Sequence, residues 1–303
     1  MVNGCRFHFV VPLLAKSMAG THWHVADNPD GRSAEAAVSR CLSSLINQTV
    51  PCVIHLVCHD VPNLTITTGS HAVVNVNALA HPRNYLDHVR HDTPTIVIHQ
   101  VDFPTPDLID RDTYERLSGK PISSLPNIVR RRVGDKYSKF KIGLGAVLHD
   151  PASHFVMLVD HDDLIHRDVV AYAIEHDGLF TGGHTVTSGY AWRVGDDVFR
   201  KMDAFHKTCG SCNAVRLSEE EHEQWCAFRD IHRLGTRKQH WLFAGHGSVF
   251  ERLRKSGRET AKFPFRAAVY VTDTGANISG TKKQGRDKLP LTESLAAEFG
   301  LRV

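Results

Sequence analysis

The stretch Phe155-Val156-Met157-Leu158-Val159-Asp160-His161-Asp162-Asp163 decides how we interpret the fold of this 303-residue chain. Its first five residues are apolar without a break, which is typical of a strand buried on both faces of a parallel sheet. Three carboxylates then follow within four residues, and they repel one another unless a positive charge lies between them. The stretch therefore predicts a buried strand that ends in a charged turn.

This acidic cluster, Asp160–Asp163, has two interpretations. In the first it holds a hard divalent cation, Mg²⁺ or Mn²⁺, which takes oxygen ligands from one or two carboxylates and completes its shell with phosphate oxygens. Such a metal would neutralise a diphosphate leaving group as a Lewis acid. In the second, Asp162 or Asp163 is the N-cap of the next helix, where the helix dipole favours acidic groups. The cluster alone does not decide between them.

Three more buried strands are expected upstream, at Phe7–Val11 before Pro12, at Val53–Cys58 before His59-Asp60, and at Thr95–His99. Amphipathic helices are indicated by apolar residues at helical spacing: Val38, Cys41, Leu42, Leu45 and Ile46, then Tyr137, Phe140, Leu144, Val147 and Leu148, then Val169, Val170, Ala173 and Ile174. This alternation predicts an α/β fold with a mostly parallel sheet flanked by helices. Ligands bind at the carboxyl ends of such strands, so Asp60, Asp102 and the acidic cluster are expected at one edge.

The second half of the chain is less regular. We expect strands at Thr185–Trp192 and Ala267–Thr272, and a helix over Glu219–Leu234 that begins with a capping box of Ser218 and Glu221. The tail after Asn277 is rich in Lys, Arg, Gly and Thr and is expected to be a flap. The sequence contains no internal repeat and no long linker, so one continuous domain is expected.

Composition restricts the class of protein. Lys and Arg number 36 against 33 Asp and Glu, so no nucleic-acid partner is indicated. The seven cysteines are odd in number and lie mostly in apolar stretches, which favours a reducing, cytoplasmic compartment. No apolar run approaches the roughly 20 residues of a membrane helix. Peripheral contact with a membrane is compatible with this composition. The 21 histidines are scattered, and we interpret only those with a sequence context.

Three stretches together resemble the family-2-type glycosyltransferases of the GT-A fold, within the nucleotide-diphospho-sugar transferase superfamily. The first runs from the strand that closes on proline, through the helix ending in Leu45-Ile46-Asn47-Gln48-Thr49, to the strand ending at Asp60. The second is Asp135–Gly143, similar to the family's basic helix before its metal motif. The third is Phe155–Asp163, similar to its apolar strand followed by D-x-D-D. The resemblance covers roughly residues 7–175.

The resemblance implies a Rossmann-type sheet in which residues 1–175 bind the donor and residues 176–303 form the acceptor half and the C-terminal flap of the same domain. Pro12 would line the nucleotide pocket, and Asp60 would contact the base. Lys136 and Lys139 would face the diphosphate. A UDP-sugar is the favoured donor, and a saccharide or another hydroxyl compound is the acceptor. The pair His59-Asp60 departs from the family's acidic pair, which leaves the base open.

The resemblance also implies a metal centre with Mn²⁺ or Mg²⁺ as the cofactor. Asp160 would hold the ribose or share the metal, and Asp162 would be the principal ligand. Several GT-A enzymes take a third ligand from a C-terminal histidine. His246, between Gly245 and Gly247, is our candidate, because glycine on both sides permits a close approach. The alternative is a turn histidine that bonds only to the backbone.

The catalytic base is the least defined part of the expected site. Gly210–Arg216 resembles the segment that lies under the donor sugar in the family. An inverting transferase needs a carboxylate to take the proton of the acceptor hydroxyl, and the family's Glu-Asp pair is absent. Asp230 is our candidate, with Glu219–Glu221 as the alternative. Inversion and retention both remain open.

His206-x-x-Cys209-x-x-Cys212, with His222 and Cys226 downstream, has a second interpretation as a zinc site. The alternative is that these cysteines are small buried apolar residues. Two main functions follow from the sequence as a whole. The chain is a metal-dependent glycosyltransferase of the hexosyltransferase type, or it is a non-catalytic nucleotide-sugar-binding protein on the same scaffold. A phosphoryl-transfer enzyme would want a glycine-rich loop after the first strand, which the residues after Pro12 do not supply.

Overall fold

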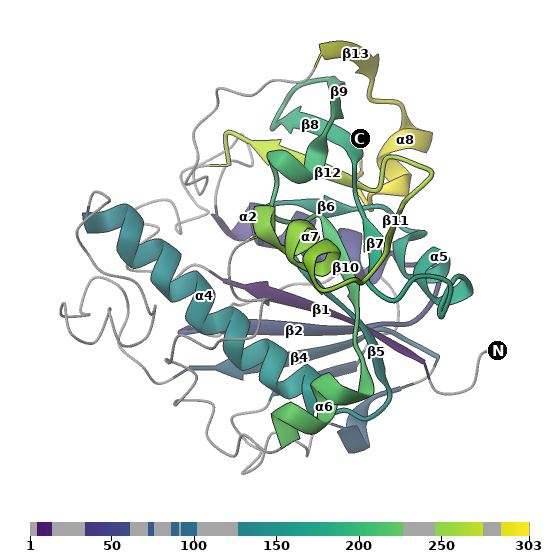
Figure 1. Cartoon of the computed structure of the whole chain (residues 1–303). Helices are drawn as coiled ribbons and strands as arrows, with labels where there is room; N and C mark the ends of the chain where they lie inside the picture. Colours follow the sequence, from purple (N-terminus) through teal and green to yellow (C-terminus); the bar gives the residue numbers. More distant parts are fainter. Residues whose placement is uncertain are drawn as a thin grey trace.

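The computed structural model describes residues 5–13, 34–60, 72–75, 86–90, 92–101, 127–226, 246–274 and 286–302. Its larger sheet consists of β1 (Arg6–Pro12), β2 (Val53–Cys58), β3 (Ala72–Asn75), β4 (Thr95–Gln100), β5 (Ser153–Leu158), β7 (Gly183–Thr185), β10 (Asn213–Arg216) and β11 (Thr260–Lys262). These eight strands lie in the order β11-β7-β10-β5-β1-β2-β4-β3 (Figure 1).

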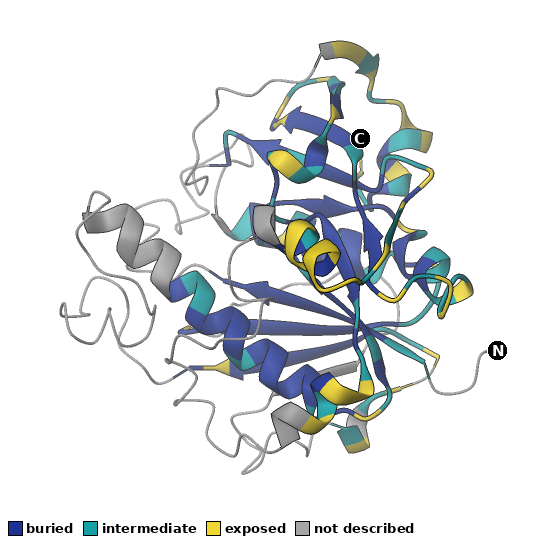
Figure 2. Ribbon diagram, viewed as in Figure 1, coloured by how far each residue is buried: buried dark blue, intermediate teal, exposed yellow. Residues whose placement is uncertain are grey.

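The five strands from β3 to β5 in this order are mutually parallel, so their carboxyl ends meet at one edge of the sheet. Strand β10 then runs antiparallel to β5, and β7 runs antiparallel to β10. Figure 2 shows the central strands as buried along most of their length, as their mostly apolar sequences predict. The expected fold class, an α/β fold with a mostly parallel sheet flanked by helices, is confirmed.

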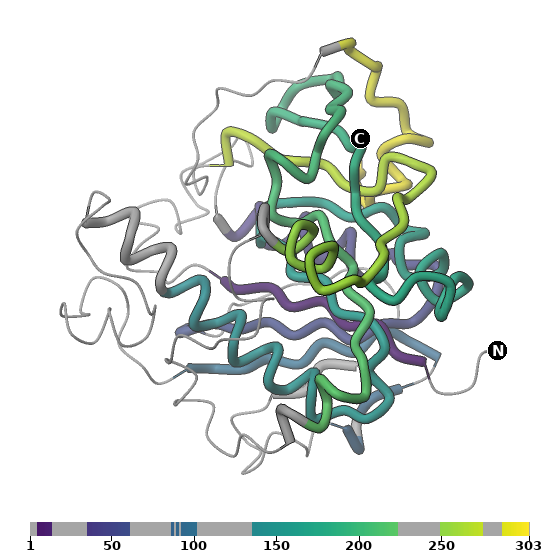
Figure 3. Tube along the Cα trace, in the orientation of Figure 1, coloured from purple at the N-terminus to yellow at the C-terminus, as the bar shows by residue number. Residues whose placement is uncertain are grey.

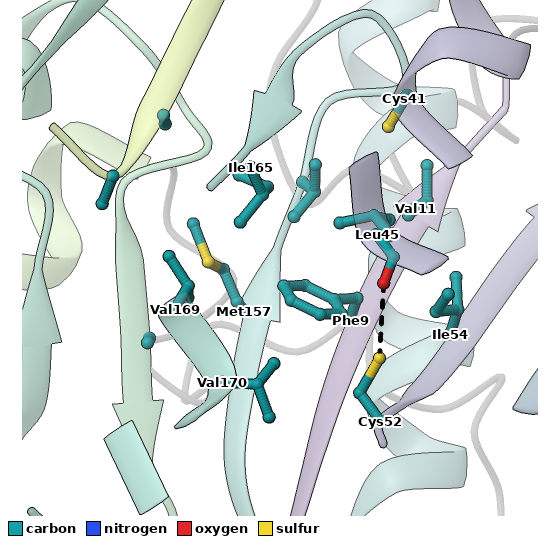
Figure 4. Close-up of a cluster of buried hydrophobic side chains, with 14 of the residues drawn as sticks. Phe9, Val11, Cys41, Leu45, Cys52, Ile54, Met157, Ile165, Val169 and Val170 are labelled. Atoms are coloured by element: carbon teal, nitrogen blue, oxygen red, sulfur yellow. Dashed lines mark hydrogen bonds between the residues drawn. The ribbon is translucent and has the colours of Figure 1, made fainter. Parts of the chain in front are cut away.

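Helices cover both faces of the larger sheet. Helices α2 (Ala34–Ile46) and α5 (Val169–Glu175) pack on one face, where the side chains of alternate strand residues form the main core. Figure 4 shows part of this core, with Phe9 of β1 and Met157 of β5 between the helices. The opposite face is covered by α4 (Asn127–Leu148), through Phe140, Leu144 and Val147.

A second, smaller sheet lies beside the larger one. Its strands are β6 (Leu164–Ile165), β8 (Ser188–Arg193), β9 (Val198–Asp203), β12 (Ala268–Thr272) and β13 (Arg286–Pro290), in the order β13-β9-β8-β12-β6. Its own core includes Tyr190, Trp192 and Phe199. The C-terminal segment runs along this sheet in Figure 3, and α8 (Glu293–Glu298) is followed by the fully buried Phe299. The described part of the expected flap is therefore packed on a core.

The expected strand Thr185–Trp192 is wrong in one respect. The chain leaves the larger sheet after Thr185 and enters the smaller sheet at Ser188, so the stretch forms the end of β7 and most of β8. An apolar run does not reveal a change of sheet, because both sheets bury it equally. The expected capping box is confirmed at α6 (Glu219–Cys226). The Ser218 backbone N–H donates to Glu221 Oε2 at 2.8 Å, and the Glu221 N–H donates to Ser218 Oγ at 3.2 Å.

Three buried histidines form a hydrogen-bonded ladder across β1, β2 and β4. His8 Nδ1 lies 3.0 Å from His55 Nε2, and His55 Nδ1 lies 2.9 Å from His99 Nε2. Successive rings have centroids 5.2 Å apart and stack at an interplanar angle of 22°. Strand alternation places all three on the face that α4 covers, with Val10 and Val57.

Among the described helices, none combines the length and the apolar character that a membrane span requires. The remaining described elements are α7 (His246–Lys255) and two short 3-10 helices, η4 (Leu86–His88) and η6 (Phe205–Lys207). Strands from both sides of residue 175 belong to the larger sheet, since β7, β10 and β11 extend the row that β1 to β5 begin.

Candidate functional site

The ends of β1, β2 and β5 place three of the expected site residues along one edge of the sheet. Pro12 is the last residue of β1, and the following Leu13 N–H donates to Val57 O of β2 at 2.9 Å. On the other side, the Val159 N–H donates to Val10 O at 3.0 Å, so Asp160 emerges beside the end of β1. Asp60, two residues after β2, is exposed at the same edge.

The interpretation of the acidic cluster as a helix cap is wrong. Helix α5 begins at Val169 and its N-cap residue is Asp168, five residues beyond Asp163. Strand β6 of the smaller sheet lies in between. The three carboxylates therefore stand in the connection between the two sheets, and the element that directly follows them is a strand, not a helix.

Lys136 of α4 forms an ion pair with Asp160, between Nζ and Oδ1. Both side chains are about one fifth exposed, so the pair borders the surface. Burial alone would lower the pKa of Lys136, but the attraction of Asp160 outweighs it and the pKa lies above its ordinary value. The ammonium of Lys136 thus supplies part of the positive charge that the cluster needs.

Asp162 is buried, and its Oδ2 accepts a hydrogen bond from Thr274 Oγ1 at 3.3 Å. Burial raises the pKa of Asp162 and the neighbouring Asp160 raises it further, against the opposing effects of His161 and Lys136. Thr274 follows β12 of the smaller sheet. Asp162 is therefore held at the junction of the two sheets by a residue more than 100 positions away.

Asp163 serves the structure of this junction. Its Oδ2 accepts hydrogen bonds from Ser211 Oγ at 2.7 Å and from Cys209 Sγ at 3.0 Å, while the Val271 N–H lies 3.4 Å from its Oδ1. Ser211 Oγ also accepts the Asp160 N–H at 2.8 Å. The segment Gly210–Arg216, singled out from the sequence, is thereby tied to both ends of the acidic cluster. Both oxygens of Asp163 are therefore bonded within the junction.

Lys139 lies one turn after Lys136 but is fully buried. Its Nζ donates to Leu13 O at 2.6 Å and pairs with Asp135 Oδ2 at 2.7 Å, and Asp135 Oδ1 in turn lies 2.7 Å from His59 Nε2. Burial lowers the pKa of Lys139, only partly offset by Asp135. This arrangement fixes the ends of β1 and β2 to α4. Direct contact of Lys139 with a diphosphate stays a prediction. The contacts of Lys139 in the structure are with Leu13 and Asp135, and they hold the carboxyl ends of β1 and β2 in place.

The end of α2 supports the same junction from the other face. The Ile165 N–H donates to Ser44 Oγ at 3.1 Å. Gln48 Nε2 donates to His166 O at 3.0 Å, and Gln48 Oε1 accepts the Val170 N–H at 3.2 Å. Ser44, in the last turn of α2, and Gln48, two residues after it, therefore hold the chain where it leaves the acidic cluster.

The sequence-based zinc interpretation finds no support in the described residues. Cys209 Sγ donates to Asp163, and Cys212 Sγ accepts the Asn213 amide at 3.0 Å. His222 has Nδ1 3.1 Å from Leu148 O and Nε2 2.9 Å from Ser153 O, so its ring lies between two backbone carbonyls. In the part of the chain that the structure describes, these side chains form no group of three converging ligand atoms.

For three other expected site residues, the structure describes either no part or only the backbone. Asp230 and Asp102 fall in stretches that the structure does not describe, and His246 is the first residue of α7 but its side chain is not described. Their roles stay predictions. The sequence did not reveal two contributions to this site: the hydrogen bond of Thr274 to Asp162, and the pairing of Asp135 with Lys139. The i,i+4 spacing of Asp135 and Lys139 was the available signal for the second.

Comparisons with known proteins add little to this geometry. No protein-family model matches the chain, and no curated protein matches its sequence. Among solved structures, the chain is similar to residues 1–349 of S. aureus TarS, a glycosyltransferase, with 10% sequence identity and a TM-score of 0.32. The match covers 88% of this chain and 60% of that chain, so the chain spans less than two thirds of that structure. A TM-score of this size assigns the chain to no family.

Proposed function

We propose that this protein is a metal-dependent glycosyltransferase that binds a nucleotide-diphosphate sugar at the carboxyl edge of the larger sheet. The observation that carries the proposal is the acidic cluster: Asp160 and Asp162 follow a buried parallel strand, lack a helix to cap, and have Lys136 beside them. The sequence resemblance to family-2-type enzymes supports the same reading. A UDP-sugar as donor, a hydroxyl compound as acceptor and a cytoplasmic location are parts of the proposal.

The residues present fit Mn²⁺ or Mg²⁺ better than a softer metal. Asp160 and Asp162 offer carboxylate oxygens only, which are the ligands of hard divalent cations. In the described residues no third side chain converges with these two as a three-ligand site. Two carboxylates plus substrate phosphate oxygens are a common shell for Mg²⁺ in such sites. The Lys136 ammonium beside Asp160 stands where positive charge is needed. Once bound, the metal would neutralise the diphosphate leaving group.

The chain's own residues have separate tasks in this proposal. Lys136 moves from Asp160 to a phosphate oxygen of the donor when metal and donor bind, because the Asp160 carboxylate then has the divalent metal as a stronger partner. Asp60 and Pro12 border the nucleotide. Asp163, held by Ser211 and Cys209, keeps the connection between the sheets in place. Asp230 as catalytic base and His246 as third metal ligand remain further proposals from the sequence.

The test is turnover. Purified protein is incubated with Mn²⁺ and a panel of UDP- and GDP-sugars, and released nucleoside diphosphate is measured with and without acceptor saccharides. We expect release that requires Mn²⁺ and falls by at least roughly tenfold in Asp162→Asn, the effect of losing about 1.4 kcal/mol of stabilisation. Asp196→Asn, which removes the same charge in the turn before β9, is the matched control and should retain activity.

The second candidate is a nucleotide-sugar-binding protein without turnover, which the missing Glu-Asp pair favours. It predicts Mn²⁺-dependent binding of a nucleoside diphosphate with no release or transfer from any sugar in the panel. Binding lost in Asp162→Asn together with absent turnover would decide for this candidate. Turnover that is equal with Mn²⁺ and with a chelator would contradict the metal site.

A further inference from the structure

A second group of metal-binding side chains lies at the opposite edge of the larger sheet. Cys5 immediately precedes β1, His154 is the second residue of β5, and Asp177 follows α5. One ligand atom from each lies within 4.8 Å of the others. All three side chains are partly exposed. His154 and Asp160 are six residues apart along the strand, which separates the two sites by roughly 20 Å.

The backbone brings these three residues together through a local irregularity. Arg6 pairs with Ser153 and Phe7 pairs with Phe155, so β5 has one extra residue, His154, opposite the start of β1. An extra residue of this kind redirects its side chain and is rare in parallel sheets. Asp177 is positioned by the end of α5, with Gly178 at a φ of 83° directly after it.

Arg216 of β10 orients the carboxylate of this group. Its Nε donates to Asp177 Oδ1 at 2.6 Å, while Asp177 Oδ2 faces His154 Nδ1 at 3.1 Å. A second partner that fixes one carboxylate oxygen and leaves the other for the metal is the usual support of a metal ligand. The 3.1 Å separation is close to the roughly 3.3 Å edge between nitrogen and oxygen ligands of a tetrahedral zinc ion.

We propose that Cys5, His154 and Asp177 form a site for a borderline-soft divalent ion of the zinc class, with solvent as the fourth ligand. One thiolate, one imidazole and one carboxylate suit Zn²⁺ or Co²⁺, whereas the oxygen-only acidic cluster suits Mn²⁺ or Mg²⁺. Binding releases the Cys5 thiol proton to solvent. His154 would bind the ion through Nδ1, with its ring proton on Nε2. The His154 side chain is 38% exposed, which gives the ion a route of entry.

The site would add a further link to an edge where the Arg6–Asp150 and Arg216–Asp177 ion pairs already join distant parts of the chain. It would link Cys5, directly before β1, to β5 and, through Asp177, to the end of α5. Its role is therefore structural: it fastens the start of β1, the central strand of the sheet. The donor site at the other edge is expected to bind its nucleotide whether or not this ion is present.

The experiment uses Co²⁺ as a spectroscopic probe of the metal-free protein. We expect one Co²⁺ per chain, visible bands of a tetrahedral ion, and a near-ultraviolet thiolate-to-cobalt band that Zn²⁺ abolishes by competition. Cys5→Ser should lose the thiolate band, and His154→Ala should weaken binding by at least about tenfold. His206→Ala is the matched control, because it disrupts the other cysteine and histidine motif, and its spectrum should match the wild type.

Zn²⁺ should also raise the melting temperature of the wild type and of His206→Ala but leave that of Cys5→Ser unchanged. Circular dichroism of the metal-free variants shows whether they are folded, and binding of Mn²⁺ with UDP provides an independent check of the other site. A thiolate band that persists in Cys5→Ser, or one that disappears in His206→Ala, would overturn the proposal. So would a wild-type protein that shows no cobalt spectrum at saturating Co²⁺.

Discussion

In the proposed site, Lys136 and a divalent cation would compete for the carboxylate of Asp160. The ammonium pairs with Asp160 in the structure, so a metal that used Asp160 would have to displace it. The displaced ammonium is then available to a phosphate on the same metal. On this proposal, Lys136 would weaken the binding of the metal alone and strengthen the binding of the metal with its nucleotide.

The variant Lys136→Met separates these two effects. We expect it to bind Mn²⁺ alone more tightly, and to bind UDP in the presence of Mn²⁺ more weakly, each by roughly tenfold or about 1.4 kcal/mol. Isothermal titration calorimetry measures both affinities. Lys255→Met, at the exposed end of α7, is the control and should change neither. Mn²⁺ affinity that falls with UDP affinity would show that Lys136 does not compete with the metal.

At the scale of elements, the histidine ladder has a defined direction. His8 Nε2 lies 2.7 Å from Ser153 Oγ and 3.4 Å from Asp150 Oδ2. The Ser153 hydroxyl donates to Val147 O of α4 at 2.9 Å, so His8 Nε2 must carry the proton. A neutral His8 then accepts at Nδ1, and the Nε2 atom of each following histidine is the donor. The ladder thus connects three strands to each other and to α4.

The ladder predicts a loss of stability in mild acid. Burial lowers the pKa of His55 well below its usual range and lowers the pKa of His99 to about 4. Burial also lowers the pKa of His8. Asp150 opposes this shift, and the positive charges of Arg6 and His222 add to it. The unfolded histidines titrate near 6.5, so the unfolded chain binds protons that the folded chain refuses. The contribution of these histidines to the free energy of unfolding is therefore complete above about pH 6.5 and falls as the pH is lowered towards 4.

His99→Gln tests this assignment, because a glutamine amide can still donate to His55 Nδ1 and does not titrate. In the wild type we expect His99 alone to lower the free energy of unfolding by about 2 kcal/mol between pH 7.5 and pH 5. This contribution should be absent in the variant. Urea unfolding at the two pH values measures it. An equally steep loss in His99→Gln would contradict the assignment.

The close packing of α4 on β1 and β2 is what brings Lys136 and Lys139 to the edge. At Gly143 a Cβ atom would overlap Cγ1 of Val10 and lie 3.2 Å from Cγ2 of Val57. We expect Gly143→Ala to destabilise the fold by about 1–3 kcal/mol through overpacking. The higher helix propensity of alanine offsets up to about 1 kcal/mol of this loss. Urea unfolding checks the value.

Val10→Ala supplies the matched test of that cause. It makes room for the added methyl group, so the double variant should lose less stability than the two single variants together, by at least roughly 0.5 kcal/mol. Strict additivity would mean that the cost of Gly143→Ala arises elsewhere.

At the scale of the whole molecule, the sequence predicted the parts that local pattern controls. The strands expected from mostly apolar runs at β1, β2, β4 and β5 and the helices expected from the spacing in α2, α4 and α5 are confirmed, because a buried parallel strand and an amphipathic helix are both visible in a short window. Asp60 and Asp160 share an edge as expected, since parallel strands end together.

Features that depend on register or on distant contacts could not be predicted. The ladder needs His8, His55 and His99 in matched register on one face, which no single strand shows. The pairing of Asp162 with Thr274 joins residues 112 positions apart. The acidic cluster resembled a helix start only because β6 has two residues, too few to give a pattern.

The binding of a nucleoside diphosphate through a metal at Asp162 is the central claim, and a thermal shift tests it most directly. At hundredfold excess over the dissociation constant, Mn²⁺ with UDP should stabilise the wild type by about 2.7 kcal/mol, a rise in melting temperature of roughly 5 °C or more. Neither ligand alone should produce that rise, and Asp162→Asn should abolish it while Asp196→Asn retains it. A full response in Asp162→Asn, or none in the wild type with any nucleoside diphosphate, would contradict the account.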